Sequence, residues 1–431
     1  MRKTTMTKTT IIQKRPLGSI CLAVAVLAAT WLAPNTPAQS FVLKNRPSFR
    51  AGKLLRVDLR ARIQGDFRAF SPDLKTNEGT FDLNRARIGL DGEFLKHFQY
   101  QVEREFRESF GGLQSKHPWR DVYVDFDYFG NFQVQAGKFK IPFSMEQTTG
   151  VANLDFVQRA RIADDLAPAR DIGVMLHGRF FKRGFGYEAG VFRNDGESSE
   201  SHDSVRGKRT YALRLNGTPL RPLRLPFELG KIELAAATVS TDVPEGLNGL
   251  RGQTNSGNEF FPRLYVQGRR LRFGTEFRWQ PGPFSLKSEW VHVSEPRHSQ
   301  SIRGNDLPAK ISRGWYVTAA WTITGESTDG GVEPRRPFPS KGPGAIQIAT
   351  RYEQLRFGSA EHFGTPFSSP RASNIRANSD RAWTTGINWY LNHFTKVQVN
   401  GIHETIEDLD RSPIPGRNEY WMGMLRLQFS M

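Results

Sequence analysis

Apolar and polar residues alternate along most of the chain after residue 54, and this pattern constrains the fold more than any other feature. In the first run, the odd positions 55–63 are leucine, valine, alanine or isoleucine, and the even positions 56–64 are arginine, aspartate or glutamine. A period of two places successive side chains on opposite faces of a β-strand. The chain contains sixteen such segments and no amphipathic helix of useful length, so the sequence predicts an all-β protein. The segments lie near 54–67, 81–91, 98–107, 120–128, 132–140, 171–180, 185–193, 210–218, 228–239, 271–279, 284–293, 314–324, 345–355, 382–391, 395–405 and 419–429.

The connections between these segments alternate in length. Those after odd-numbered segments are mostly long and polar, such as 194–209 and 356–381, whereas those after even-numbered segments are mostly short, such as 129–131 and 280–283. The connection 325–344 is an exception because it is long and rich in proline and glycine. Long external loops and short periplasmic turns are the plan of bacterial outer-membrane barrels, while a soluble β-sandwich has no reason to alternate its loops. We therefore expect a 16-stranded antiparallel transmembrane β-barrel.

The lipid face of such a barrel decides where the charges lie. In the last segment, Trp421, Leu425, Leu427 and Phe429 share one parity and Arg426 lies on the other. A basic side chain facing lipid at the bilayer midplane costs about 2–4 kcal/mol. The charged parity must therefore face the lumen, which predicts a channel lined by many arginines.

The first 38 residues resemble a secretory signal peptide. Residues 1–15 hold five basic residues and no acid, Leu17 begins an apolar run, and small residues precede Gln39. A membrane anchor is the alternative, but the apolar run is short. We expect residues 1–38 to be removed and residues 39–431 to form the barrel. The only cysteine, Cys21, then leaves with the signal, and the formal net charge falls from +17 to +12 because five basic residues are lost.

Three stretches carry a resemblance to a known family. Residues 134–146 read VQAGKFKIPFSME and are followed by DFVQRA at 155–160 and RDIG at 170–173. This stretch resembles the phosphate-selective porin O and P family, in which a strand ending in Gly-Gln-Phe-Lys-x-Pro-Phe-Gly precedes a loop with Phe-x-x-Arg. Here Lys138 replaces the glutamine and Ser144 the second glycine. The family's second strand resembles residues 84–92, which read NRARIGLDG. Its tenth turn and eleventh strand resemble residues 282–290, which read GPFSLKSEW.

The resemblance implies a homotrimer of sixteen-stranded barrels in the outer membrane of a Gram-negative-type bacterium. It also implies that the third external loop, about Ile141–Arg170, folds inward and narrows the pore. Lysines and arginines of the wall and of this loop would then pass an anion from the mouth to the constriction.

The chemistry of phosphate agrees with a basic lumen. A narrow pore removes part of the anion's hydration shell, and arginine replaces it with planar, bidentate donors. Several moderate sites let the ion leave again. The candidate anion-binding residues are Arg56, Arg60, Arg62, Arg85 and Arg87 on the first two strands, and Lys138, Lys140, Arg159, Arg161 and Arg170 at the constriction.

Two other roles for these cations stay open. Wall arginines often pair with acids across the lumen and brace the wall, and Asp58, Glu103 and Glu105 share their parity. External basic residues such as Arg297 and Arg303 could instead contact lipopolysaccharide phosphates.

The sequence thus predicts an outer-membrane porin for passive diffusion of small anions, with phosphate or polyphosphate as the natural solute. A general diffusion porin with weak anion preference is the alternative. A barrel enzyme and an adhesion barrel are less well supported, because no Ser/His/Asp set appears and the external loops are not exceptionally long. The nine histidines show no metal-ligand spacing, and no glycine loop leads into a helix to cradle a phosphate. We expect no metal and no cofactor, and as partners inorganic anions and outer-membrane lipid with lipopolysaccharide, but no nucleic acid.

Overall fold

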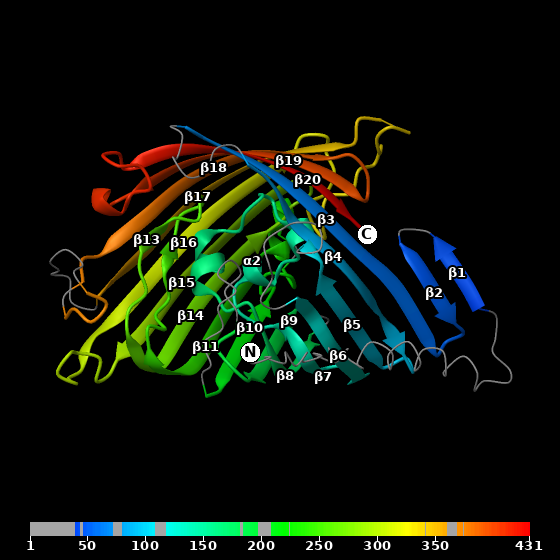
Figure 1. The fold of residues 1–431 in the computed structure, drawn as a ribbon. Helices are drawn as coiled ribbons and strands as arrows, with labels where there is room; N and C mark the ends of the chain where they lie inside the picture. Colours follow the sequence, from blue (N-terminus) through cyan, green and yellow to red (C-terminus); the bar gives the residue numbers. More distant parts are fainter. Residues whose placement is uncertain are drawn as a thin grey trace, which may run out of the picture.

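Sixteen antiparallel strands close into a barrel in the computed structural model (Figure 1). The structure describes residues 39–43, 46–71, 80–107, 118–181, 184–196, 208–223, 225–340, 342–359, 369–373 and 375–431. Each barrel strand pairs with the next along the chain, and the last strand pairs with the first from Ser430↔Arg62 to Trp421↔Ser71, which closes the cylinder. The barrel strands are β3 (Leu55–Ser71), β4 (Thr80–Phe94), β5 (Phe98–Glu105), β6 (Trp119–Phe129), β7 (Phe132–Lys140), β8 (Arg170–Phe180), β9 (Phe185–Phe192), β10 (Thr210–Gly217), β11 (Glu233–Gly246), β14 (Val266–Trp279), β15 (Phe284–Arg297), β16 (Leu307–Thr322), β17 (Ala345–Ser359), β18 (Asn378–Tyr390), β19 (Thr395–Ile406) and β20 (Glu419–Ser430).

This architecture confirms the predicted fold class and strand number, and every expected segment overlaps one barrel strand. Several boundaries differ from expectation, and two of these differences have a clear local reason. The segment expected at 228–239 begins only at Glu233, because a 3₁₀ turn, η4 (Pro226–Lys231), opens at the proline, which favours the first turn of a helix. β16 begins at Leu307, seven residues before its expected start, because it continues to pair with β15 above the membrane-facing stretch. The expected signal peptide, residues 1–38, lies outside the described residues.

Four further strands are not part of the barrel wall. β1 (Gln39–Leu43) and β2 (Pro47–Ala51) form a hairpin, and β2 pairs with the first residues of β3. β12 (Gly252–Gln253) and β13 (Glu259–Phe261) form a small ladder within one external loop.

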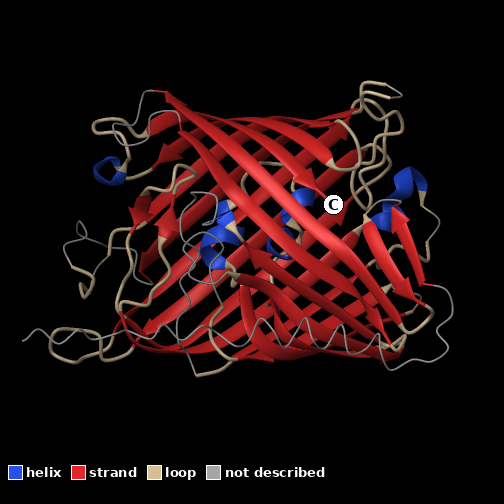
Figure 2. Cartoon of the chain, turned by 45° about the vertical axis from the view of Figure 1, so that its right-hand side comes forward, coloured by secondary structure: helices blue, strands red, loops and turns tan. Residues whose placement is uncertain are grey.

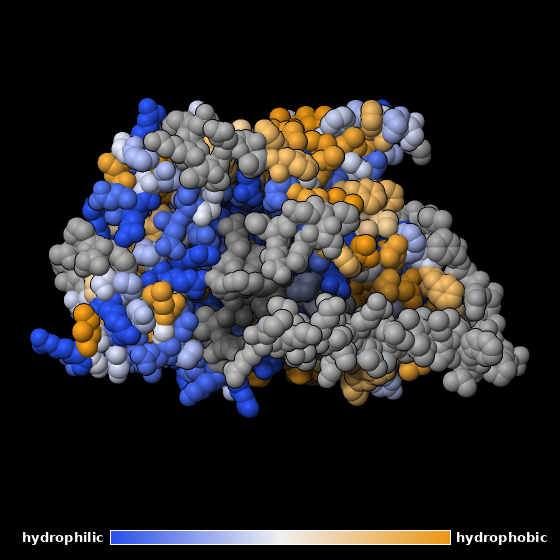
Figure 3. Space-filling model, viewed as in Figure 1, coloured by the Kyte–Doolittle hydropathy of each residue, from blue (hydrophilic) through white to orange (hydrophobic). Residues whose placement is uncertain are grey.

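The barrel wall has an apolar outer face and a polar inner face. In β20 the outward Leu425 and Leu427 are 44% and 56% exposed, whereas the intervening Arg426 is 1% exposed. Hydrophobic side chains gather over the strands, and hydrophilic ones gather at the end of the molecule where β13 lies (Figure 3). Within the described residues, no helix has the length and apolar character needed to cross a membrane.

The interior is crossed by helical turns that belong to the connection between β7 and β8 (Figure 2). These are α2 (Met145–Thr148), η2 (Val151–Asn153) and η3 (Ile162–Leu166). They place the main buried hydrophobic cluster inside the lumen rather than within the wall, because its members come from this connection, from β13 and from the inner faces of several strands.

Candidate functional site: a basic cavity inside the barrel

The third external loop, residues 141–169, folds into the lumen as expected. The wall holds its backbone with charged side chains: Glu289 accepts hydrogen bonds from the Met145 and Glu146 N–H groups at 2.9 and 2.8 Å. Further along, Arg272 donates to the Leu166 carbonyl at 2.8 Å and Lys396 donates to the Leu154 carbonyl at 3.0 Å. All three wall residues lie on β14–β20, so the loop is attached to that side of the barrel.

A second external connection, residues 247–265, also folds inward, which the alternation of residues does not predict. Its Gln253 N–H donates to the Asp165 carboxylate at 2.9 Å, and its Asn255 N–H donates to Glu404 at 2.8 Å. Gln158 reaches from the third loop to the Asn255 carbonyl at 2.9 Å. The two loops therefore support one another against β14–β20.

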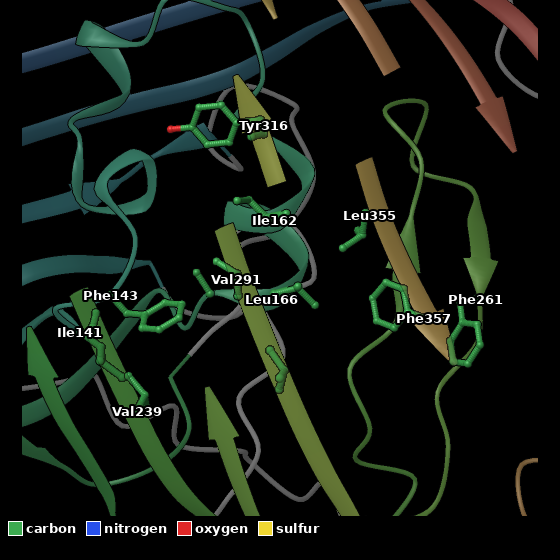
Figure 4. Close-up of a cluster of buried hydrophobic side chains, with 14 of the residues drawn as sticks. Ile141, Phe143, Ile162, Leu166, Val239, Phe261, Val291, Tyr316, Leu355 and Phe357 are labelled. Carbon is green, nitrogen blue, oxygen red and sulfur yellow. The ribbon is translucent and has the colours of Figure 1, made fainter. Parts of the chain in front are cut away.

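Apolar contacts fill the space between the third loop and the wall. Ile162 and Leu166 of the loop lie among Val291, Leu355 and other wall residues (Figure 4), and all of them are buried. A glycine on the wall makes this approach possible, because a Cβ at Gly314 would lie 2.5 Å from Ile162 Cγ2. These side chains occupy the space between loop and wall around Ile162, whereas a cavity of about 490 Å³ remains on the same side of the barrel, next to Met145 and Phe156.

A polar cavity of about 390 Å³ remains between the third loop and the strands β3–β6. Nine basic residues line it, against three acids, which are Asp82, Glu105 and Asp164. The basic residues are Arg68, Arg85, Arg87, Arg107, Arg120, Lys140, Arg159, Arg170 and Arg426. Asp121 and Asp66 behind the lining pair with Arg170 and Arg426, and the remaining excess of positive charge in this partly enclosed cavity attracts anions and repels cations.

The wall arginines expected as a ladder mostly have carboxylate partners. Arg56 lies 3.2 Å from Asp58, Arg60 lies 3.5 Å from Asp91 and Arg62 lies 4.0 Å from Glu103. Among the candidates on β4, Arg87 contacts Glu105 at 2.7 Å. This is the bracing arrangement, in which each cation is balanced locally and contributes less to the net field of the lumen.

Three candidates differ, because their hydrogen bonds go to neutral acceptors. Arg85 donates to the Gln64 side-chain oxygen at 2.9 Å. Lys140 donates to the Thr148 and Thr149 carbonyls at 3.0 and 2.9 Å. Arg159 donates to the Glu146 and Thr149 carbonyls, both at 2.9 Å. We call Arg85, Lys140 and Arg159 the basic triad.

The members of the basic triad lie close together across the cavity. Arg159 acts electrostatically on both Arg85 and Lys140, and all three line the same cavity. Burial lowers the pKa of the Arg159 guanidinium, since water no longer solvates its charge fully. A bound anion would replace that lost solvation, which makes the triad a candidate anion site.

The other constriction candidates occupy different positions. Arg161 is 1% exposed and its guanidinium lies 3.1 Å from Asp165, so it holds the loop together rather than lining the cavity. Arg170 lines the cavity but donates to Asp121 at 3.0 and 2.8 Å. The sequence leaves the parity around Lys138 and Lys140 open because the strand ends there. In the structure Lys140 lines the cavity, whereas Lys138 does not and aligns with Ile172, which is 52% exposed on the outer face.

Sequence reasoning missed several cavity residues. Alternation places Arg426 on the inner face of β20, and this residue lines the cavity and donates to the Val157 carbonyl at 2.7 Å, although it is not among the predicted anion-binding residues. Arg68 continues the inner parity of β3 beyond the expected strand end. Arg107 and Arg120 lie where β5 and β6 end and begin, at a shift in register that alternation alone does not predict.

The comparisons with known proteins agree with this geometry. Three solved structures share the fold over nearly their whole length: the channel DcaP of Acinetobacter baumannii (TM-score 0.57, 11% identity, covering 89% of this chain and 99% of that one), OmpT of Vibrio cholerae (0.55, 9%, 89% and 99%) and an anion-selective porin from Comamonas acidovorans (0.53, 12%, 87% and 99%). No curated protein matches the chain. A closed sixteen-stranded barrel with an inward loop and a polar lumen defines an outer-membrane porin, which is a channel and not an enzyme.

The particular family follows from the sequence match. The family described as phosphate-selective porin O and P matches residues 57–413. The chain therefore belongs to the phosphate-selective porin O and P family, as the motifs around residues 134–173 indicated.

Proposed function

We propose that this porin conducts small anions, with phosphate-like oxyanions as the preferred solutes, through the cavity between the third loop and β3–β6. The observation that carries the proposal is the basic triad, whose cations donate to carbonyl and amide oxygens instead of carboxylates. Arginines in direct ion pairs present little net charge, whereas the triad's hydrogen bonds go to neutral oxygens and leave its charge less fully balanced, even though Glu146 and Asp164 act on Arg159. Tetrahedral oxyanions present several acceptor oxygens to such a cluster, which favours them over chloride.

The wall arginines have a second role in this proposal. Arg56, Arg60 and Arg62 form a line along β3 that leads away from the triad, and each has a carboxylate nearby. Mixed charges of this kind bind an anion weakly, so it moves on toward or away from the triad without being trapped. Arg87 and Arg170 form ion pairs with Glu105 and Asp121, so these two cations brace the wall beside the triad.

A general diffusion porin with weak anion preference remains the second candidate. The extensive pairing of the wall arginines with acids favours this second candidate. With those arginines paired, the triad alone would distinguish this lumen from one that carries balanced positive and negative charge. The family and an OmpT structure from Vibrio cholerae described as a trimer support a homotrimer for this chain too.

Conductance in planar bilayers separates the two candidates. For an oxyanion-preferring pore, the reversal potential in a KCl gradient should show anion selectivity, and added phosphate should reduce the chloride current at concentrations far below that of chloride. A chloride current that is indifferent to phosphate would support the general porin. Equal permeability to potassium and chloride would reject both forms of anion preference.

A further inference from the structure

Basic residues also gather on the outer face of the barrel, on four neighbouring strands far in sequence from the lumen cluster. Arg313 of β16 is directly opposite His292 of β15 on one side and Arg356 of β17 on the other. Arg381 of β18 lies opposite Gln354, which is two residues from Arg356 on the same face. Direct partners in an antiparallel pair have Cβ atoms about 5 Å apart, and diagonal neighbours are about 7–8 Å apart. We call His292, Arg313, Arg356 and Arg381 the rim patch.

The rim patch lies immediately outside an aromatic row. The row includes the outward-facing Trp290, Trp315 and Trp383, which are 39%, 36% and 53% exposed. Each lies two positions closer to the periplasmic end of its strand than the rim-patch residue of that strand. Tyr352 continues this row between Trp315 and Trp383, and its ring lies 5.6–5.7 Å from each of theirs. Exposed Trp and Tyr rings mark the boundary between hydrocarbon and headgroups. The rim patch is therefore at headgroup level, on the external side.

The charge on this patch is poorly balanced by the protein. Among the described residues, the acid that forms an ion pair with the rim patch is Glu407, which lies 3.3 Å from Arg356. Within the described residues, Arg313 and Arg381 are exposed and have no ion pair. Like charges directly opposite one another on a sheet are destabilising, so adjacent Arg313 and Arg356 favour an anion between them.

We propose that the rim patch binds the phosphate groups of lipopolysaccharide in the outer leaflet. Arginine suits this ligand because its planar donors match phosphate oxygens, and the aromatic row beneath it accommodates the acyl chains. Arg297, considered earlier for this contact, is 1% exposed and donates to the Tyr265, Ala372 and Pro370 carbonyls inside the external loops, so it does not reach lipid. The patch faces away from the lumen, so this inference does not depend on the solute of the pore.

The test compares the intact porin with Arg313→Gln/Arg356→Gln/Arg381→Gln. Arg269→Gln is the matched control, because Arg269 is an exposed basic residue of β14 that has its own partner, Asp242, at 3.5 Å. All three proteins, purified in detergent, are titrated with lipopolysaccharide, with the same lipopolysaccharide after removal of its phosphates, and with phosphatidylglycerol. A basic residue near an anionic membrane surface contributes about 5-fold to binding, so the triple variant should bind lipopolysaccharide about 100-fold more weakly. The control should bind like the unaltered protein, and unaltered single-channel conductance should show that the variant is folded.

Three results would overturn the proposal. The first is equal binding by the triple variant and the unaltered protein. The second is equal binding of phosphorylated and dephosphorylated lipopolysaccharide, or equal loss with phosphatidylglycerol, which would mean that the patch responds to any anionic lipid. The third is a change in oligomeric state with unchanged lipopolysaccharide binding, which would assign this face to contact with a second copy of the chain.

Discussion

Replacement of Arg85 tests the basic triad most directly. Arg85 belongs to the wall and, among the described residues, donates to Gln64, so Arg85→Gln removes one positive charge and leaves the third loop attached by Lys140 and Glu289. A unit charge about 4 Å from a monovalent anion contributes about 1 kcal/mol even in a water-like environment, and about twice that for a divalent anion. These free energies correspond to a change in the binding constant of about 5-fold for chloride and about 30-fold for divalent phosphate. A less polar cavity would increase both.

The assay is inhibition of chloride current by phosphate in planar bilayers. We expect Arg85→Gln to raise the inhibitory phosphate concentration by about 30-fold at a pH where phosphate is divalent, and to lower the selectivity for chloride over potassium by less. Arg56→Gln is the matched control, because it removes the same charge from a residue that lies 3.2 Å from Asp58. Lys138→Gln, on the outer face, should change neither quantity. If Arg56→Gln and Arg85→Gln weakened inhibition equally, the distinction between braced and unbalanced cations would be refuted.

Three further predictions concern the structure that positions the site. Gly314→Val should reduce single-channel conductance, because its side chain would displace Ile162 and push the third loop into the cavity; conductance equal to the unaltered protein would show that the loop yields elsewhere. Asp66→Ala should lower the free energy of unfolding by about 3–5 kcal/mol, because the substitution removes the carboxylate that lies 2.6 Å from the buried Arg426 guanidinium. Urea titration in lipid measures this free energy, and Asp82→Ala serves as the comparison. Hydrogen bonds from His298 and the Ser299 N–H lower the pKa of Asp306, so the external turn 298–306 is stabilised above the ordinary aspartate pKa of 3.8 and loses that stabilisation as the pH falls through the lowered value. Hydrogen exchange in this turn, corrected for intrinsic rates, should accelerate in acid, and Asp306→Asn should show no such pH dependence.

The strands of this porin were predictable because one physical constraint acts on every one of them. Lipid excludes charge from one face, so the alternation around Leu425 and Arg426 had to repeat in all sixteen segments. The same constraint placed Arg85 and Arg87 in the lumen. It failed near Lys138 and Lys140, because the strand ends there and the backbone leaves the regular ladder to become the third loop.

Alternation identifies the side of the wall that a residue faces, but it carries no information about the partner of that residue. Arg87 and Arg85 lie two positions apart on one strand and share one face, yet one contacts Glu105 and the other an amide. The difference arises from residues brought alongside by register, including the shift between Gln64 and Gly65 in the β3–β4 pairing. The carbonyls that hold Lys140 and Arg159 become available only when residues 144–149 turn into the lumen, where Glu289 accepts from their N–H groups. The unbalanced charge of the triad is thus a consequence of loop folding: the wall supplies the carboxylates that fix the loop, and the loop returns carbonyl oxygens that hold the cations without neutralising them.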